Sequence, residues 1–223
     1  MNNLRDLYKV LLYLFLFYSP LLIFGQKKTS TSTITLNEVI LESIKSDKSK
    51  NILPLSLSFS DLKDQQGFYQ KLSLQEYLVS VPGLFTQNAN NYAQDLRISL
   101  RGFGARAAFG IRGIKIVVDG IPETTPDGQG QLDNLPLGLL KNFEVLRGPS
   151  ASLYGNASGG VIYLNTIDSL QEGQNIQFQY RFGDFGFKSY EINTFFKGEK
   201  TSALIHLNRT QTNGFRFNSG FEQ

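Results

Sequence analysis

Residues 143–165 read FEVLRGPSASLYGNASGGVIYLN and contain two apolar segments separated by a glycine-rich connection. The apolar segments, FEVL at 143–146 and VIYLN at 161–165, are rich in β-branched and aromatic residues, which favour strands. The connection contains four glycines, which allow tight turns and positive-φ conformations that other residues adopt less readily. The stretch therefore predicts two strands of a compact sheet with a tightly folded connection between them.

Shorter apolar segments before this stretch predict the rest of a small domain. Alternation at 53–59 and the runs RISL at 97–100 and IKIVV at 114–118 predict strands. Residues 73–81, SLQEYLVSV, have leucines at helical spacing, Ser73 as a candidate N-cap and Pro82-Gly83 as a stop signal. A short helical turn is expected at 135–140. The sequence thus predicts a mixed α+β domain over about 52–167.

The pattern changes after residue 168. Segments 174–182, 190–196 and 203–208 alternate apolar and polar residues and are separated by glycine-containing turns. Strands of about ten residues with one apolar and one polar face are typical of a transmembrane β-barrel wall. An ordinary antiparallel sheet on a soluble core gives the same alternation, so periodicity alone leaves both interpretations open.

The beginning of the chain predicts export. Residues 1–9 are polar and basic, 10–24 are almost wholly apolar, and Gly25 offers a small residue for cleavage, as in a signal peptide. The apolar run is shorter than the roughly 20 residues of a membrane-spanning helix, and Pro20 interrupts it. Residues 26–51 then form a polar lead, predicted to be flexible, around one apolar patch at 34–44.

Composition excludes several functions. The chain has no cysteine, so disulfide frameworks and cysteine-ligated metals are excluded, and its net charge of +3 without a basic cluster argues against nucleic acid. His206 is the only histidine, and it falls on the polar face of a predicted strand. The pattern G-x-G-x-x-A at 102–107 matches a dinucleotide fingerprint, but further glycines at 110 and 113 disfavour the required helix. We therefore expect no enzymatic activity, no metal site and no cofactor.

Four segments occur in an order that resembles one family. SLQEYLVSVPGL (73–84), LRISLRGFG (96–104), IVVDGIP (116–122) and FEVLRGPSASLYGNASGG (143–160) are similar to the plug domain of TonB-dependent receptors. The resemblance covers about 53–166, and 97–131 is most similar to ferric-citrate-type siderophore receptors. It implies a signal peptide at 1–25, a lead at 26–51, an α+β plug at 52–167 and the first strands of an incomplete antiparallel transmembrane β-barrel at 168–223. The chain is thus expected to be an N-terminal fragment.

The resemblance also implies roles for three groups of residues. In the lead, a TonB box would bind TonB by adding a short strand to its sheet. In the plug, motif residues would gate the pore, with Arg101, Arg147 and Glu144 pairing with the wall. Two polar loops, flanked by Arg97, would face an anionic ligand. The TonB-box candidates are Thr35, Leu36, Asn37, Glu38, Val39, Ile40 and Leu41; the plug candidates are Arg101, Gly102, Asp119, Gly120, Glu144, Arg147, Gly148, Pro149, Tyr154, Gly155, Gly159 and Gly160; the ligand-facing candidates are Asn88, Asn90, Tyr92, Arg106, Arg112, Asp127 and Gln129.

The implied function is TonB-dependent active transport across the outer membrane of a Gram-negative bacterium. The expected substrate is a ferric siderophore or a ferric-citrate-like chelate. The expected partners are TonB with its inner-membrane energising complex, outer-membrane lipid and the small iron chelate. An exported soluble β-rich binding or adhesion protein is the main alternative, and a soluble enzyme with a nucleotide-binding fold is a weaker one.

Overall fold

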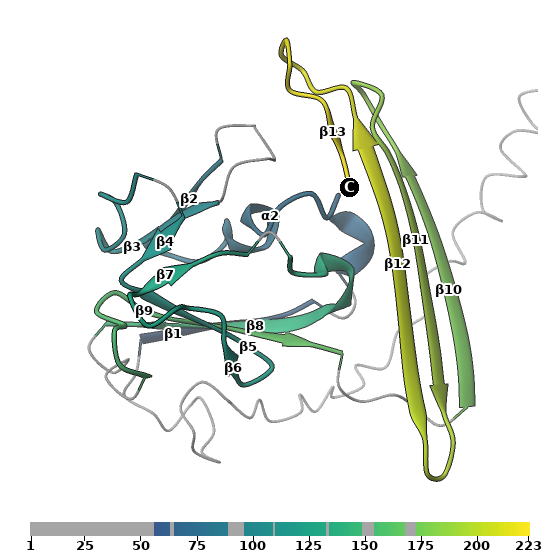
Figure 1. Cartoon of the computed structure of the whole chain (residues 1–223), viewed down its shortest axis with the longest axis horizontal. Coiled ribbons are helices and arrows are strands. Elements are labelled where there is room, and N and C mark those ends of the chain that lie inside the picture. The colour runs from purple at the N-terminus through teal and green to yellow at the C-terminus, as the bar shows by residue number, and fades with distance from the viewer. Residues whose placement is uncertain are drawn as a thin grey trace, which may run out of the picture. The chain divides into compact units, whose positions relative to one another are not determined.

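The computed structural model describes residues 56–62, 65–88, 96–108, 110–132, 134–148, 154–167 and 173–223, which all belong to one compact unit of the chain. The predicted signal peptide, the predicted TonB box at 35–41, and Asn90, Tyr92 and Pro149 lie outside these ranges. Within them, no helix is long and apolar enough to cross a membrane. We call residues 56–167 the plug and the strands from β10 (Gly173–Phe182) to β13 (Phe221–Glu222) the wall sheet (Figure 1).

The main sheet of the plug contains five strands in the order β1-β8-β9-β5-β6. The central pair, β9 and β5, is parallel, and the other pairs are antiparallel. Apolar side chains cover both faces of the central strands, which explains why their sequences are continuous apolar runs rather than alternating ones. The strands are β1 (Ser56–Asp61), β5 (Ile114–Val118), β6 (Ile121–Pro122), β8 (Leu140–Arg147) and β9 (Gly160–Thr166).

Short elements cover one face of this sheet. Tyr77 and Leu78 of the short helix are fully buried there with Ile98 and Leu100. The helix is shorter than predicted, and its N-cap is Leu74 rather than Ser73, whose hydroxyl accepts a hydrogen bond from the Gln75 amide (3.3 Å). The elements are η3 (Gln66–Phe68), α2 (Gln75–Leu78), η4 (Leu137–Leu139) and two small ladders, β2 (Leu84–Gln87) with β3 (Arg97–Leu100) and β4 (Ile111–Arg112) with β7 (Gln129–Gly130).

The wall sheet is a separate antiparallel sheet in the order β10-β11-β12-β13 (Figure 1). Short turns join its three long strands, and their register is regular over the whole length. It aligns residues in rows across the sheet, for example Phe178, Ile192 and Leu207. The strands are β10 (Gly173–Phe182), β11 (Lys188–Lys197), β12 (Ser202–Thr212) and β13 (Phe221–Glu222).

The wall sheet has its apolar face outside and its polar face inside. Phe178 is 64% exposed and Leu207 is 60% exposed, whereas Glu191 is 2% and Asn193 is 4% exposed. A sheet on a soluble core buries its apolar face, so this arrangement is the reverse of the soluble interpretation. It is the arrangement of a barrel wall that presents apolar side chains to lipid and polar ones to the lumen.

Candidate functional site

A cluster of buried charged side chains joins the plug to the wall sheet. Lys71 Nζ of the plug lies 2.7 Å and 3.0 Å from the two carboxylate oxygens of Glu191 on β11, and both side chains are almost fully buried. Arg181 on β10 also donates to Glu191, with both Nη atoms at 3.1 Å. The Asn193 amide donates to the other carboxylate oxygen at 3.0 Å. One carboxylate therefore binds two cations, and we call Lys71, Arg181 and Glu191 the charge cluster.

The backbone around Lys71 is shaped by Glu76. The Glu76 carboxylate accepts hydrogen bonds from four consecutive backbone amides, those of Gln70, Lys71, Leu72 and Ser73, at 2.8 to 3.3 Å. Lys71 itself has a φ of 62°, a left-handed conformation that is uncommon for a residue with a side chain. The loop is thus fixed in a conformation that directs the Lys71 side chain to the wall.

Strand alternation places the wall partners on one face. Gln179 and Arg181 of β10, Glu191 and Asn193 of β11 and His206 of β12 occupy alternate positions that face the plug. The register pairs Gln179 with Glu191 and Asn193 with His206. His206 Nδ1 lies 2.6 Å from the Asn193 side-chain oxygen. The alternation that places apolar residues outside thus also aligns the polar network inside.

Burial opposes the charge of Lys71. It lowers the pKa of the Lys71 ammonium below its usual value, while the hydrogen bond and the negative charge of Glu191 counteract part of this effect. Buried charges are costly to assemble, and removing one partner is costlier still. The charge cluster therefore opposes separation of the plug from the wall, because separation would remove Lys71 from its partner.

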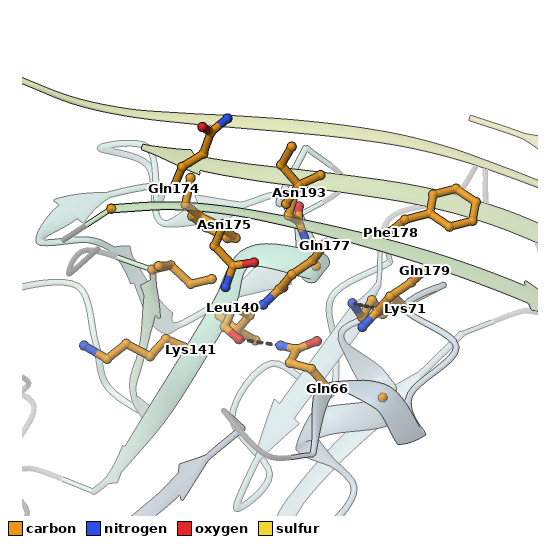
Figure 2. A pocket seen from close by; sticks show the side chains of 16 residues that line it. Gln66, Lys71, Leu140, Lys141, Gln174, Asn175, Gln177, Phe178, Gln179 and Asn193 are labelled. Carbon is orange, nitrogen blue, oxygen red and sulfur yellow. Dashed lines mark hydrogen bonds between the residues drawn. The ribbon is translucent and has the colours of Figure 1, made fainter. Parts of the chain in front are cut away.

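A polar crevice of about 820 Å³ lies beside the charge cluster, between the plug and β10. Figure 2 shows Asn175 and Gln177 of β10 pointing toward the plug, where Gln66 donates to the Leu140 carbonyl oxygen. Lys71 and Lys141 also line it, and no Asp or Glu is among the described lining residues. The crevice therefore offers mainly amide groups, which suit solutes with anionic or carbonyl oxygens, because the Lys71 ammonium already donates to Glu191 and Gln179.

The structure places Arg101 and Arg147 together at the start of β1. Arg101 Nη2 donates to Ser56 Oγ at 3.0 Å, and Arg147 donates to the Pro82 carbonyl at 2.9 Å and more weakly to the Ser56 carbonyl at 3.5 Å. These contacts lie within the plug. Glu144, on β8, is 1% exposed inside the plug. The predicted pairing of these three residues with the wall stays a prediction. Among the residues that the structure describes, Lys71 forms an ion pair with Glu191 of the wall sheet.

Asp119 fastens the last strand of the plug. It occupies the turn after β5 with a φ of 49°, and its carboxylate accepts from the Thr166 amide (2.8 Å) and hydroxyl (2.6 Å). Thr166 is the last residue of β9, before the connection to the wall sheet. The predicted motif residue thus ties a plug turn to the point where the chain leaves the plug.

The glycine-rich connection packs tightly, as expected. A Cβ atom on Gly159 would lie 2.6 Å from Phe103 Cβ, and one on Gly160, at a φ of 148°, would overlap the Leu146 carbonyl. Tyr154 packs beside Leu146 and Val161, and burial raises the pKa of its phenol to about 12. The remaining glycines of this group adopt positive φ values at turns: Gly102, Gly120, Gly148 and Gly155.

The residues predicted to face the ligand do not form one site, because they lie in different parts of the plug. Pairing of β4 with β7 brings Arg112 Nη2 to 3.4 Å from the Gln129 side-chain oxygen. The Asp127 carboxylate accepts a hydrogen bond from the backbone N–H of Gln129 at 3.3 Å. A hollow of about 520 Å³ beside Asp127 and Gln129 is also lined by Glu123, and no arginine is among its described lining residues. Asn88 instead lines another hollow with Lys71 and His206, and Arg106 is exposed elsewhere.

Comparisons with known proteins agree with this architecture. Residues 55–161 match the family model of the TonB-dependent receptor plug domain. The chain is 38% identical to the hemin receptor of Yersinia pestis over 105 residues and 29% identical to the vitamin B12 transporter BtuB of Vibrio vulnificus over 101 residues. Each match covers 45% of this chain but only 14% and 16% of those relatives.

A solved structure extends the comparison into the wall sheet. The ferric yersiniabactin uptake receptor FyuA of Yersinia pestis matches with a TM-score of 0.52 at 19% identity, over 71% of this chain and 24% of the receptor. The relatives are receptors and transporters rather than enzymes, in agreement with the predicted absence of catalysis. The chain therefore contains the plug domain of a TonB-dependent outer-membrane receptor, followed by strands that resemble the start of the receptor barrel.

Proposed function

We propose that the chain is the gating part of a transporter that imports an iron chelate across the outer membrane with energy supplied through TonB. The observation that carries the proposal is the wall sheet, whose apolar residues face outward and whose polar residues hold the plug through the charge cluster. In a barrel, such a plug closes the lumen until it is displaced. The soluble binding-protein alternative would leave this apolar face without a function.

The plug must be held firmly and yet be movable. The buried pair between Lys71 and Glu191 resists separation, because separation leaves the charge of Lys71 without its partner. Movement is still allowed, because Arg181 keeps the Glu191 carboxylate paired when Lys71 leaves. We infer that force on the lead, delivered by TonB at the predicted box at 35–41, moves the plug and separates this pair. The polar crevice beside the pair would then widen.

The substrate proposal rests on chemistry that the relatives share. The named relatives take hemin, vitamin B12 and ferric yersiniabactin, each of which holds a metal in an organic chelate. Amide groups along the crevice suit a chelate with anionic oxygens. We therefore propose a ferric siderophore or ferric-citrate-like chelate, with hemin as the second candidate because of the 38% identity to a hemin receptor.

Binding to TonB tests the energy coupling. The full-length receptor would be titrated with the C-terminal domain of TonB, comparing wild type with Val39→Pro and with Ser46→Pro as a control outside the box. Proline removes a backbone donor, so Val39→Pro should weaken strand addition about tenfold or more, while Ser46→Pro should bind like wild type. Equal binding by all three proteins would remove residues 35–41 from the proposed contact.

A further inference from the structure

Gly138 is a plug residue that lies against Glu191 and His206 of the wall sheet. It is the middle residue of η4, and it borders the polar crevice. A Cβ atom built on Gly138 would overlap a carboxylate oxygen of Glu191 and lie 2.9 Å from both Glu191 Cδ and His206 Cε1. The φ of Gly138 is not positive, so the absence of a side chain serves close approach rather than backbone conformation.

Hydrogen bonds hold both sides of this contact in place. On the plug side, the carbonyl oxygen of Leu137 accepts hydrogen bonds from Tyr77 (3.4 Å) and Gln66 (3.5 Å), which lie beneath the turn. On the wall side, Glu191 is held by Lys71, Arg181 and Asn193. A side chain at position 138 would therefore push the plug and the wall apart instead of being absorbed locally.

We propose that Gly138 is a positioning residue that sets the spacing between the plug and the wall, and thereby keeps the crevice beside β10 closed to passive flow. The inference rests on the proposed function insofar as the plug closes a pore. Its basis is the geometry of three residues from different elements, Gly138, Glu191 and His206, which meet at one point. Separation at this point would also lengthen the Lys71–Glu191 pair.

Gly67 provides a matched control. It is the middle residue of η3, another three-residue helical turn of the plug, it lines the same crevice, and it also lacks a positive φ. A Cβ atom on Gly67 would meet nothing within 4 Å. An alanine at either position thus changes local backbone preference in the same way, but only Gly138→Ala meets the wall.

The test is passive ion flux through the full-length receptor in lipid bilayers, without TonB and without substrate. We expect Gly138→Ala to raise the flux about tenfold, equivalent to about 1.4 kcal/mol, while Gly67→Ala behaves like wild type. Because TonB is absent, this outcome does not depend on whether TonB drives transport. Unchanged flux in a Gly138→Ala protein with an assembled barrel would overturn the proposal.

A combined variant distinguishes a direct contact between position 138 and the wall from general destabilisation of the protein. His206→Ala removes one of the two side chains that an alanine at 138 would meet and leaves the charge cluster intact, so Gly138→Ala should raise the flux less in that background than in wild type. If Gly138→Ala alone does not assemble, adding His206→Ala should increase the assembled fraction. Fully additive flux, or an unchanged failure to assemble, would contradict a direct contact between position 138 and the wall.

Discussion

Glu191 carries more of the plug–wall contact than either cation that it binds. Lys71 and Arg181 both donate to its carboxylate, so the charge cluster has a formal charge of +1. Removing Lys71 leaves a matched Arg181–Glu191 pair. Removing the charge of Glu191 leaves two buried cations facing each other without a counter-ion, which is the costlier change.

We therefore predict that Glu191→Gln destabilises the seated plug more than Lys71→Met does. Glu191→Gln should cost about 3 kcal/mol or more, and Lys71→Met should cost less. Chemical unfolding of the plug in the purified full-length receptor measures both changes. Equal costs, or a larger cost for Lys71→Met, would show that the carboxylate is not the centre of the cluster.

The strands of the wall sheet have one apolar face and one polar face. Leu207 lies in the middle of the exposed apolar face, in a row with Ile192 and Phe178, whereas the adjacent His206 faces the plug. Arginine on a lipid-facing position near the midplane of a barrel costs about 2–4 kcal/mol. Leu207→Arg should therefore destabilise the folded barrel by about that amount.

The control for this prediction is on the same strand. Asn208 is adjacent to Leu207 but points to the opposite, polar face. Asn208→Arg should change barrel stability much less, because the lumen solvates a charge. Reversible unfolding of the full-length receptor in lipid vesicles compares the two variants. A smaller cost for Leu207→Arg than for Asn208→Arg would indicate that the apolar face does not contact lipid.

The sequence predicted those strands that are long enough to show a pattern of apolar and polar residues. The alternating wall strands and the apolar runs of β3, β5, β8 and β9 were recognisable because their length gives a pattern. The two-residue strands β4, β6 and β7 carry no period, and β2 was missed because four residues beside a turn resemble a loop. The helix at 73–81 was predicted too long, because the chain turns after Leu78 toward Pro82-Gly83.

At the scale of the whole molecule, the contact between plug and wall was beyond sequence reasoning. Lys71 and Glu191 are 120 residues apart, and no local motif links them. Gly138 lies in the helical turn expected at 135–140, and only the docked wall reveals what a side chain there would meet. The motif arginines, by contrast, were recognisable from their sequence context, but their described hydrogen bonds lie within the plug.

Taken together, the plug, the wall sheet and the lead support our proposal that TonB moves this plug to import an iron chelate. It is tested most directly by uptake of radioactive iron into cells that produce the full-length receptor as their sole importer, supplied with a ferric siderophore, ferric citrate or hemin. We predict accumulation of one of these chelates that is lost when TonB is deleted and strongly reduced by Val39→Pro. Accumulation that persists without TonB, or no accumulation of any of the three in cells that display the folded receptor, would contradict the account.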